Sequence, residues 1–217
     1  MGRVRESETK KAEILRIAGQ LFLKQGYGKT SMRQIAAAAD ISVGLASYHF
    51  NSKRELAAEI VRRLFERMVT LAKQSVAQQE DPLLYSAVLM RLNNTVLSQP
   101  CYRQFYTDIL REDILTDVIT GTGVETYFCI RNLYCPAQSD EETERLGWYG
   151  NYISASMERT LVLYGEKRQL ISGTIAEFVI KSSLSMWDFP NARAEIERAC
   201  RESEAIVNGL LPQVENW

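Results

Sequence analysis

The stretch "GYGKTSMRQIAAAADISVGLASYHFNSKREL", residues 26–56, predicts two short helices joined by a tight turn. Ser31 and Gln34 have the Ser-x-x-Gln spacing of a capping box, in which each side chain satisfies a backbone N–H at a helix start. Four consecutive alanines follow, and their small side chains let a second helix approach closely. Asp40 lies at the bend, where the backbone must turn left-handed, and Ser42 can cap the second helix.

Two short helices joined in this way within a basic region are typical of a helix-turn-helix unit that binds DNA. Residues 1–55 carry 10 Lys+Arg against 5 Asp+Glu, whereas the remainder carries 16 against 22, although the whole chain has a net charge of only -1. This asymmetry indicates that the N-terminal end meets an anion. The alternatives are a plain helical hairpin and a chance clustering of solvated charge.

The 217 residues allow one large or two small domains with a real core. The start, MGRVRESETKKAE, has no apolar core, so we expect no signal peptide, and no apolar run approaches the roughly 18 residues of a membrane span. We therefore expect a cytoplasmic protein with reduced thiols. The four cysteines have no C-x-x-C spacing and the chain has a single histidine, so we expect neither a metal nor a cofactor. These cysteines are Cys101, Cys129, Cys135 and Cys200.

Beyond the helix-turn-helix, apolar residues recur every three or four positions, which predicts an all-α chain. We expect one helix from Ser52 to about Gln78 and two more at about 168–188 and 190–210. Two glycines and several β-branched residues make 119–128 a point where one helix breaks or another begins. Residues 135–142 are expected to form a loop, with Ser139 or Asp140 as the cap of the next helix.

The first stretch resembles the DNA-binding segment of the TetR family of transcriptional regulators over about residues 8–60. The resemblance rests on the motifs GY-x-x-T, IA, ISVG, YHF and SKREL at fixed spacing. It implies a dimeric, all-helical protein with a three-helix helix-turn-helix domain at 1–54 and a larger ligand-binding and dimerisation domain at 55–217. Two positions depart from the family pattern. Asp40 replaces a glycine, and Ser47 replaces a tyrosine that commonly contacts phosphate, so we expect a weaker backbone grip there that Tyr48 can compensate.

The resemblance also assigns roles within the DNA-binding unit. An arginine early in the first helix can reach a phosphate or a guanine edge, valine and leucine can touch thymine methyl groups, and a glycine lets the backbone approach the duplex. Serine, tyrosine and histidine suit sugar-phosphate contacts, and a lysine on the next helix adds charge to the phosphate backbone. Phe50 is expected in the core. The expected DNA contacts are Ser31, Arg33, Val43, Gly44, Leu45, Ser47, Tyr48, His49 and Lys53.

These features predict a regulator, most simply a repressor, that binds a palindromic double-stranded DNA operator as a homodimer and responds to a small, largely apolar effector. An enzyme and a non-regulatory helical adaptor are the two rival classes. The sequence has no Gly-rich phosphate loop and no Gly-x-Ser-x-Gly elbow, and its single histidine lies in the DNA-binding unit. We therefore expect no catalytic residues.

Residues 100–165 are rich in aromatic side chains, which commonly line cavities between helices. We expect a cavity between the helix that leaves the DNA-binding domain and the bundle behind it, because only there can a ligand move the recognition helices. Two residue pairs four apart, each sharing a helical face, would form a slot with ring walls and one cationic end, suited to a flat or elongated, possibly anionic molecule. The alternative is that these rings fill the slot themselves. The expected ligand contacts are Phe105, Tyr127, Arg131, Trp148, Asn151 and Tyr152.

The last two predicted helices each carry an apolar stripe. Family members commonly dimerise through their last long helices, so the resemblance predicts a four-helix bundle across a two-fold axis. The alternative is that both stripes face only their own subunit. The residues expected near the axis are Phe178, Ser182, Met186, Ile196, Ala199 and Ser203.

Overall fold

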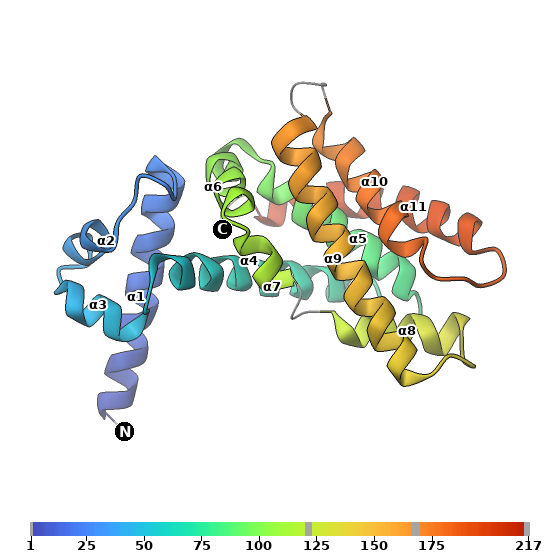
Figure 1. Cartoon of the computed structure of the whole chain (residues 1–217), viewed down its shortest axis with the longest axis horizontal. Helices are drawn as coiled ribbons and strands as arrows, with labels where there is room; N and C mark the ends of the chain where they lie inside the picture. The colour runs from blue at the N-terminus through green and yellow to red at the C-terminus, as the bar shows by residue number, and fades with distance from the viewer. Residues whose placement is uncertain (1, 120–122, 166–169, 215–217) are drawn as a thin grey trace.

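A computed structural model describes residues 2–119, 123–165 and 170–214, and in these ranges all regular structure is helical. This confirms the predicted all-α class. A small unit made of the first three helices stands beside a larger bundle, and one long helix joins them (Figure 1). The helices are α1 (Gly2–Gln25), α2 (Met32–Ala38), α3 (Val43–His49), α4 (Lys53–Ser75), α5 (Pro82–Leu97), α6 (Pro100–Arg111), α7 (Ile114–Ile119), α8 (Val124–Tyr134), α9 (Asp140–Gly165), α10 (Ser172–Leu184) and α11 (Ala192–Val214).

The helix-turn-helix forms through the local interactions that the sequence predicts. The Ser31 N–H donates to Gln34 Oε1 (2.8 Å) and the Gln34 N–H donates to Ser31 Oγ (3.3 Å), which completes the capping box of α2. Asp40 lies in the left-handed region with φ 51°, and the Leu45 N–H donates to Ser42 Oγ (3.1 Å) at the start of α3. Each of these predictions is confirmed.

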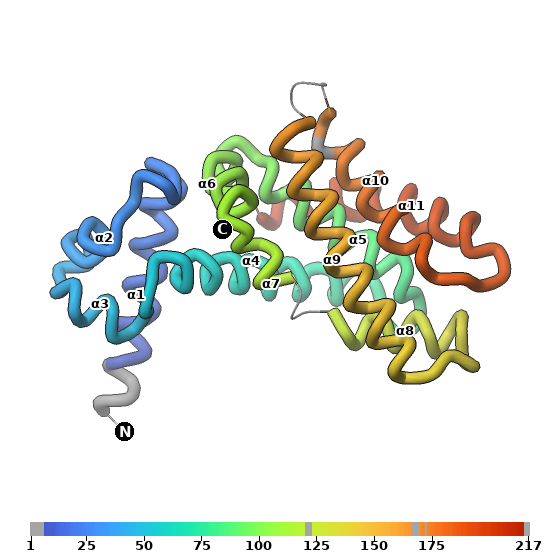
Figure 2. The backbone as a smooth tube through the Cα atoms, viewed as in Figure 1, coloured from blue at the N-terminus to red at the C-terminus, as the bar shows by residue number. Residues whose placement is uncertain are grey.

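Helix α4 connects the two parts of the molecule without a break (Figure 2). Its N-terminus is capped by Ser52, whose Oγ accepts from the Glu55 N–H (3.1 Å). It ends at Ser75, three residues before the expected end, because Val76 adopts an extended backbone with φ -138°. Because α4 is one continuous helix, a movement of its C-terminal half also moves its N-terminal end, which follows α3.

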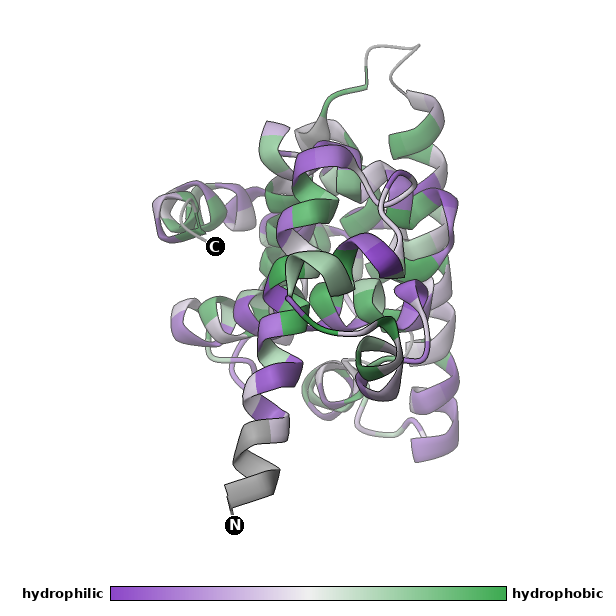
Figure 3. Cartoon of the chain, turned by 90° about the vertical axis from the view of Figure 1, so that its left-hand side faces the viewer, coloured by the Kyte–Doolittle hydropathy of each residue, from purple (hydrophilic) through white to green (hydrophobic). Residues whose placement is uncertain are grey.

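Helix α5 is the centre of the larger bundle and is contacted by α4, α6, α8, α10 and α11. Hydrophobic residues lie mainly on the inner faces of these helices and hydrophilic ones on their outer faces (Figure 3). Because helices surround α5 on most sides, its buried residues are not confined to a single stripe. Over the described ranges, no helix is both long and apolar enough to cross a bilayer.

The two predicted interruptions occur where expected. Helix α7 ends at Ile119 and α8 begins after Gly123, which has φ +86°; residues 120–122 of the predicted break lie outside the described residues. Between α8 and α9, Ser139 Oγ accepts from the Glu142 N–H (3.2 Å), so Ser139 is the capping residue. The two last helices are present with shifted ends, and residues 168 and 169 of the first lie outside the description.

The apolar stripe of α11 faces α5 of the same subunit, which corrects half of the predicted dimer interface. Ile196, Ala199 and Ser203 are 5%, 0% and 0% exposed. The Arg91 Nε–H of α5 also donates to Ser203 Oγ (2.9 Å). Placing these three residues at the dimer axis was therefore wrong, because α11 has one apolar stripe and its own subunit uses it. The other three predicted residues lie on α10 or just after it. Ser182 on α10 and Met186 after it are half-buried, and Phe178 on α10 is exposed.

Candidate DNA-binding surface and ligand cavity

Helix α3 presents an unusual apolar face to the outside. Val43, Leu45 and Tyr48 are 40%, 39% and 79% exposed. Ala46 and Phe50 point inward and are almost fully buried, which confirms that Phe50 belongs to the core. A short helix with buried small residues behind it and large apolar residues in front is suited to contact base edges and methyl groups in a major groove.

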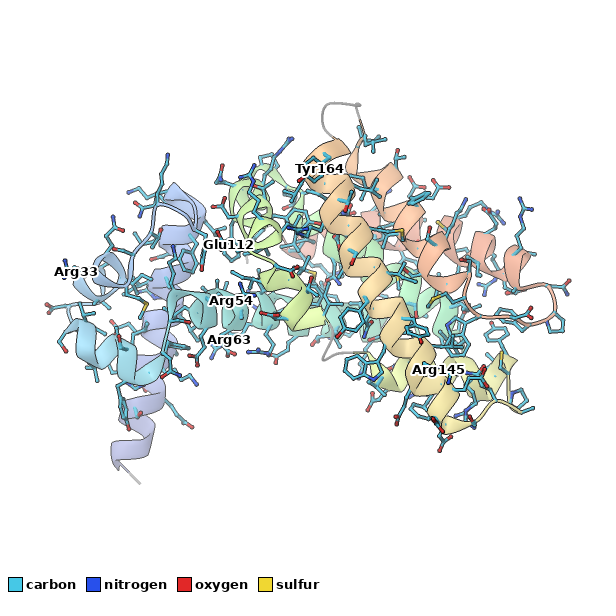
Figure 4. All side chains as sticks on the ribbon, viewed as in Figure 1. Arg33, Arg54, Arg63, Glu112, Arg145 and Tyr164 are labelled. Atoms are coloured by element: carbon cyan, nitrogen blue, oxygen red, sulfur yellow. The ribbon has the colours of Figure 1, made fainter. Side chains whose placement is uncertain are left out.

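The residues around this face differ in how exposed they are to solvent. Arg33 lies at the outer edge of the small unit, away from the bundle (Figure 4). Gly44 is exposed, and the nearest atom to a Cβ built there would be Ser42 Oγ at 3.8 Å. Ser47 and His49 are half-buried, and the Tyr48 and His49 rings meet edge to face with centroids 5.3 Å apart.

Two of the expected DNA contacts already have partners within the protein. The Lys53 ammonium donates to the Tyr27 carbonyl (2.9 Å) and lies 4.0 Å from the centroid of the Tyr27 ring. Ser31 is part of the capping box. Lys53 therefore helps to hold the α1–α2 turn against α4, whereas Ser31 holds the start of α2, and a role for either on DNA stays a prediction.

A cavity of about 630 Å³ lies between α4, α5, α8, α9 and α10. This is the position expected from the sequence, between the helix that leaves the DNA-binding unit and the bundle behind it. The wall is mostly apolar, and exposed charged side chains of α4 and α8 belong to it as well. Representative apolar wall residues are Phe65, Val69, Leu89, Met90, Tyr127 and Val179.

Of the six predicted ligand contacts, only Tyr127 and Asn151 belong to this wall. Phe105 is buried elsewhere and stacks on Phe22 of α1 with centroids 5.6 Å apart. The Arg131 guanidinium pairs with the Asp140 carboxylate (2.7 Å) rather than facing a ligand. Arg131, the predicted cationic end of the slot, is therefore not part of the cavity wall.

Trp148 and Tyr152 are the other two misplaced residues. They share a face of α9, as their spacing indicates, with ring centroids 6.3 Å apart. That face is turned outward, however, and the rings are 45% and 51% exposed. The spacing established that the two residues are neighbours but could not say which side of the helix faces the interior.

Tyr127 is held tightly at the α9 end of the cavity. A Cβ added at Gly147 would lie 2.6 Å from Tyr127 Cδ2, so the ring crosses α9 where no side chain is present. The hydroxyl donates to Asn151 Oδ1 (2.7 Å), and the ring stacks on Trp187 with centroids 6.3 Å apart. Burial raises the pKa of Tyr127 to about 12, so the phenol remains a neutral donor at physiological pH.

We expect Gly147→Ala to destabilise the protein by about 1–3 kcal/mol, because the Tyr127 ring is fixed on both sides and cannot move away from a new methyl group. Thermal unfolding should show a melting temperature lower by about 2–4 °C for each kcal/mol. Gly209→Ala on α11 is the matched control, since nothing lies within 4 Å of its Cβ position. An unchanged melting temperature for Gly147→Ala would mean that the ring is not held there.

A buried polar cluster in and behind the cavity wall was not predicted from the sequence. Glu158 of α9 lines the cavity and is 7% exposed. Its Oε1 accepts hydrogen bonds from the Tyr106 hydroxyl and from Asn94 Nδ2, the latter at 3.3 Å. Burial raises the pKa of the Glu158 carboxyl, while the two donors lower it. The same burial, together with the neighbouring carboxyl, raises the pKa of Tyr106 well above its ordinary value.

The chain is similar to known bacterial transcriptional regulators. The family model described as "Bacterial regulatory proteins, tetR family" matches residues 14–60, which contain the helix-turn-helix. The HTH-type transcriptional regulator TtgR of Pseudomonas putida is 26% identical over 175 residues, 73% of this chain and 83% of TtgR. The crystal structure of RolR in complex with resorcinol superposes with a TM-score of 0.68 at 14% identity, covering 91% of this chain and 96% of RolR. Residues 14–60 thus form a TetR-family DNA-binding domain.

Other TetR-family relatives agree with this assignment. The repressor KstR2 of Rhodococcus jostii is 35% identical over 72 residues, 33% of this chain and 35% of KstR2. SmeT, the repressor of a Stenotrophomonas maltophilia multidrug efflux pump, has the same fold with a TM-score of 0.56 at 17% identity, covering 84% of this chain and 92% of SmeT. The chain is thus similar to TetR-family transcriptional regulators over most of its length, and its N-terminal part matches their DNA-binding domain. Its relatives are regulators rather than enzymes.

Two polar side chains, Asp108 and Arg54, connect the DNA-binding unit to the larger bundle. Asp108 Oδ2 on α6 accepts from the backbone N–H of Tyr27 (2.8 Å) and more weakly from that of Gly28 (3.4 Å). Arg54 at the start of α4 donates to the carbonyl oxygens of Glu112 (2.5 Å) and Asp113 (3.2 Å). It also pairs with an acidic side chain of α7, Asp117 (2.6 Å). Arg54 and Glu112 lie together between the two domains (Figure 4).

Proposed function

We propose that this regulator is a homodimeric repressor whose affinity for a palindromic operator is controlled by a small molecule bound in the cavity behind α4. The observation that carries the proposal is the position of α4. Its N-terminal end follows α3 and contacts α1, while its residues from Arg62 to Lys73 form one wall of the cavity. A molecule that occupies the cavity acts on the same rigid helix that positions the recognition helix.

The mechanism is a shift between two populations. A dimer grips an operator when its two recognition helices are one helical turn of duplex apart, roughly 34–36 Å. A ligand that binds more tightly to a state with a different spacing lowers DNA affinity by its difference in affinity for the two states. Asp108 joins α6 to the turn after α1, and Arg54 joins α4 to α7, so α6 and α7 move together with α4 and the DNA-binding unit.

On the DNA side, the exposed face of α3 supplies the base contacts and the residues around it supply phosphate contacts. Val43 and Leu45 reach thymine methyl groups, and Gly44 brings the backbone close to the duplex. Tyr48 and Arg33 are exposed and free to reach the sugar-phosphate backbone. Ser47, His49, Lys53 and Ser31 complete the proposed surface.

Selection of bound sequences from a random pool of DNA duplexes tests this proposal. We expect an inverted repeat whose half-sites are about 10–10.5 base pairs apart, centre to centre, or a multiple of that. The selected duplex then serves in an anisotropy assay with compounds found in a thermal-shift screen, since a ligand of the native state raises its stability. Recovery of no enriched sequence would contradict sequence-specific binding, and compounds that stabilise the protein without changing DNA affinity would contradict ligand control.

We expect Asp108→Ala to loosen the α1–α2 turn, because the Tyr27 N–H loses a charged acceptor. Hydrogen bonds to charged groups contribute about 1.5–3 kcal/mol, so amide exchange at Tyr27 should accelerate by about tenfold or more. Glu112→Ala is the control, because Arg54 binds the Glu112 backbone carbonyl and not its side chain. Equal exchange rates at Tyr27 in the wild type and in Asp108→Ala would show that α6 does not hold this turn.

A further inference from the structure

The proposed ligand cavity contains one deeply buried acidic group. Glu158 is part of the cavity wall, and the groups that act on its carboxyl are Tyr106 and Asn94, both neutral. The hydrogen bonds from Tyr106 and Asn94 are both accepted by the same oxygen, Oε1. Within the described residues, Oε2 therefore remains available to a bound molecule.

No cationic side chain of the described wall neutralises this carboxyl. Arg159, the next residue, donates through Nε to the Leu110 carbonyl (2.8 Å). The basic wall residues on α4 are exposed and pair with other acids: Arg62 with Glu59 (2.5 Å), and Lys73 with Glu125 (4.0 Å). A carboxylate in a low-dielectric site is costly without a positive partner, and burial raises the pKa of Glu158 for that reason.

The other polar groups of the wall leave few donors for a ligand. The Tyr127 hydroxyl donates to Asn151, and the Ser86 hydroxyl donates to the Pro82 carbonyl (2.8 Å). Gln78 Nε2 donates to Thr126 Oγ1 (2.8 Å), and a hydrogen bond joins the hydroxyls of Ser154 and Ser183 (2.6 Å). These donors of the wall are already in use, whereas an acidic acceptor is open. The buried Asn93 Oδ1 of the same wall also has no hydrogen-bond partner within the described residues, so a molecule that brings a donor meets open acceptors here.

We propose that the ligand of this cavity is a molecule with an aromatic or aliphatic body and one protonated amine, and that the ammonium group binds the Glu158 carboxylate. This inference rests on the proposed ligand control and names the chemical class of the effector. The apolar body contacts Phe65, Val69 and Leu89, and the ammonium supplies the positive charge that the buried carboxylate lacks. A charge-assisted hydrogen bond in a site shielded from water is roughly twice as strong as a neutral one. An anionic ligand, which the sequence had suggested through Arg131, is disfavoured by the same carboxylate.

Three compounds that share one ring system test the charge preference: 2-(2-naphthyl)ethylamine, 2-(2-naphthyl)ethanol and 2-naphthylacetate. We expect isothermal titration of the full chain at pH 7 to show that the amine binds at least about tenfold more tightly than the alcohol, and that the acetate binds most weakly. In Glu158→Gln the amine should lose this advantage and bind like the alcohol, while binding of the alcohol changes little. Glutamine keeps a carbonyl oxygen that can accept from Tyr106 and Asn94, so the fold should persist.

Two further variants keep the test decisive. Glu144→Gln removes one negative charge from an exposed site on the same helix and should retain the amine preference of the wild type. Tyr106→Phe removes a donor to Glu158 and should increase the ratio of amine to alcohol affinity; it replaces Glu158→Gln as the test if that variant does not fold. Equal binding of amine and alcohol, an amine preference that survives Glu158→Gln, or no binding of the amine would each overturn the proposal.

The outcome separates this inference from the proposed function. If the amine binds through Glu158 but never changes operator affinity, the ligand class stands and ligand control fails. If a neutral compound releases DNA equally well from the wild type and from Glu158→Gln, ligand control stands and the ligand class fails.

Discussion

Replacement of Gly44 by glutamate is expected to abolish operator binding while leaving the fold intact. In the free protein the Cβ position is open, and the nearest atom lies 3.8 Å away. Glycine is also disfavoured in a helix interior by about 0.5–1 kcal/mol, so a side chain there should not destabilise α3. On DNA, the new side chain would separate the recognition helix from the duplex and place a carboxylate among phosphates. We expect a loss of about 100-fold or more, equivalent to about 2.7 kcal/mol, in an anisotropy titration with the selected operator.

Gly209→Glu provides the matched control for this experiment. Gly209 is an exposed helical glycine of α11 with no atom within 4 Å of its Cβ position, so the same change in charge and size occurs far from α3. This variant should bind the operator like the wild type. Undiminished binding by Gly44→Glu would move the base contacts away from the start of α3, whereas a similar loss in both variants would point to net charge alone.

The DNA-binding unit could be predicted from the sequence because its structure is determined locally. The capping pairs of Ser31 and Ser42, the left-handed Asp40 and the small buried Ala46 act within a few residues of themselves. Hydrogen bonds of this kind depend on residue type and spacing, which the sequence displays directly. The burial of Phe50 follows from the same short pattern.

The cavity was predicted in position but not in composition. Its place follows from the requirement that a ligand act on α4. Its lining depends on which face of α9 turns inward. The aromatic face with Trp148 and Tyr152 was predicted to lie inside, whereas that face is exposed. The inward face of α9 carries small and polar residues, because Tyr127 lies across it and the cavity adjoins it. These residues are Gly147, Gly150, Asn151, Ser154, Ala155 and Glu158.

A small and polar stripe at spacings of three and four was therefore the available signal for Glu158. Helical periodicity is usually searched with large apolar residues, and on α9 the aromatic ones lie outside. For α11 the apolar stripe was predicted correctly, but its contact was not. A stripe alone cannot distinguish contact with a helix of the same subunit from contact with a second copy. Arg91 of α5, which binds Ser203 and the Cys200 carbonyl, decides the matter for this stripe.

The outward face of α9 is the best remaining surface for the proposed dimer. Large hydrophobic side chains in the bundle are exposed mainly along α9 and α10 and just before α10, in contrast to the outward face of α11, which is largely charged or polar. Interface cores are enriched in tyrosine, tryptophan and phenylalanine and depleted in charged residues. The exposed large hydrophobics of this region are Trp148, Tyr149, Tyr152, Tyr164, Leu170, Ile171 and Phe178.

We expect Trp148→Glu combined with Tyr152→Glu to yield a folded monomer, because each side chain is about half exposed and its replacement leaves the subunit core unchanged. A monomer can engage only one half-site, so operator affinity should fall by about 10²- to 10⁴-fold as avidity is lost. Sedimentation velocity reports the assembly state, and titration of the operator reports the affinity. Leu133→Glu on α8, an exposed apolar position outside this face, should remain dimeric, and Ala199→Arg should unfold instead because Ala199 packs inside the subunit. A double variant that still sediments as a dimer would transfer the interface to α10, with Phe178 as the next residue to replace.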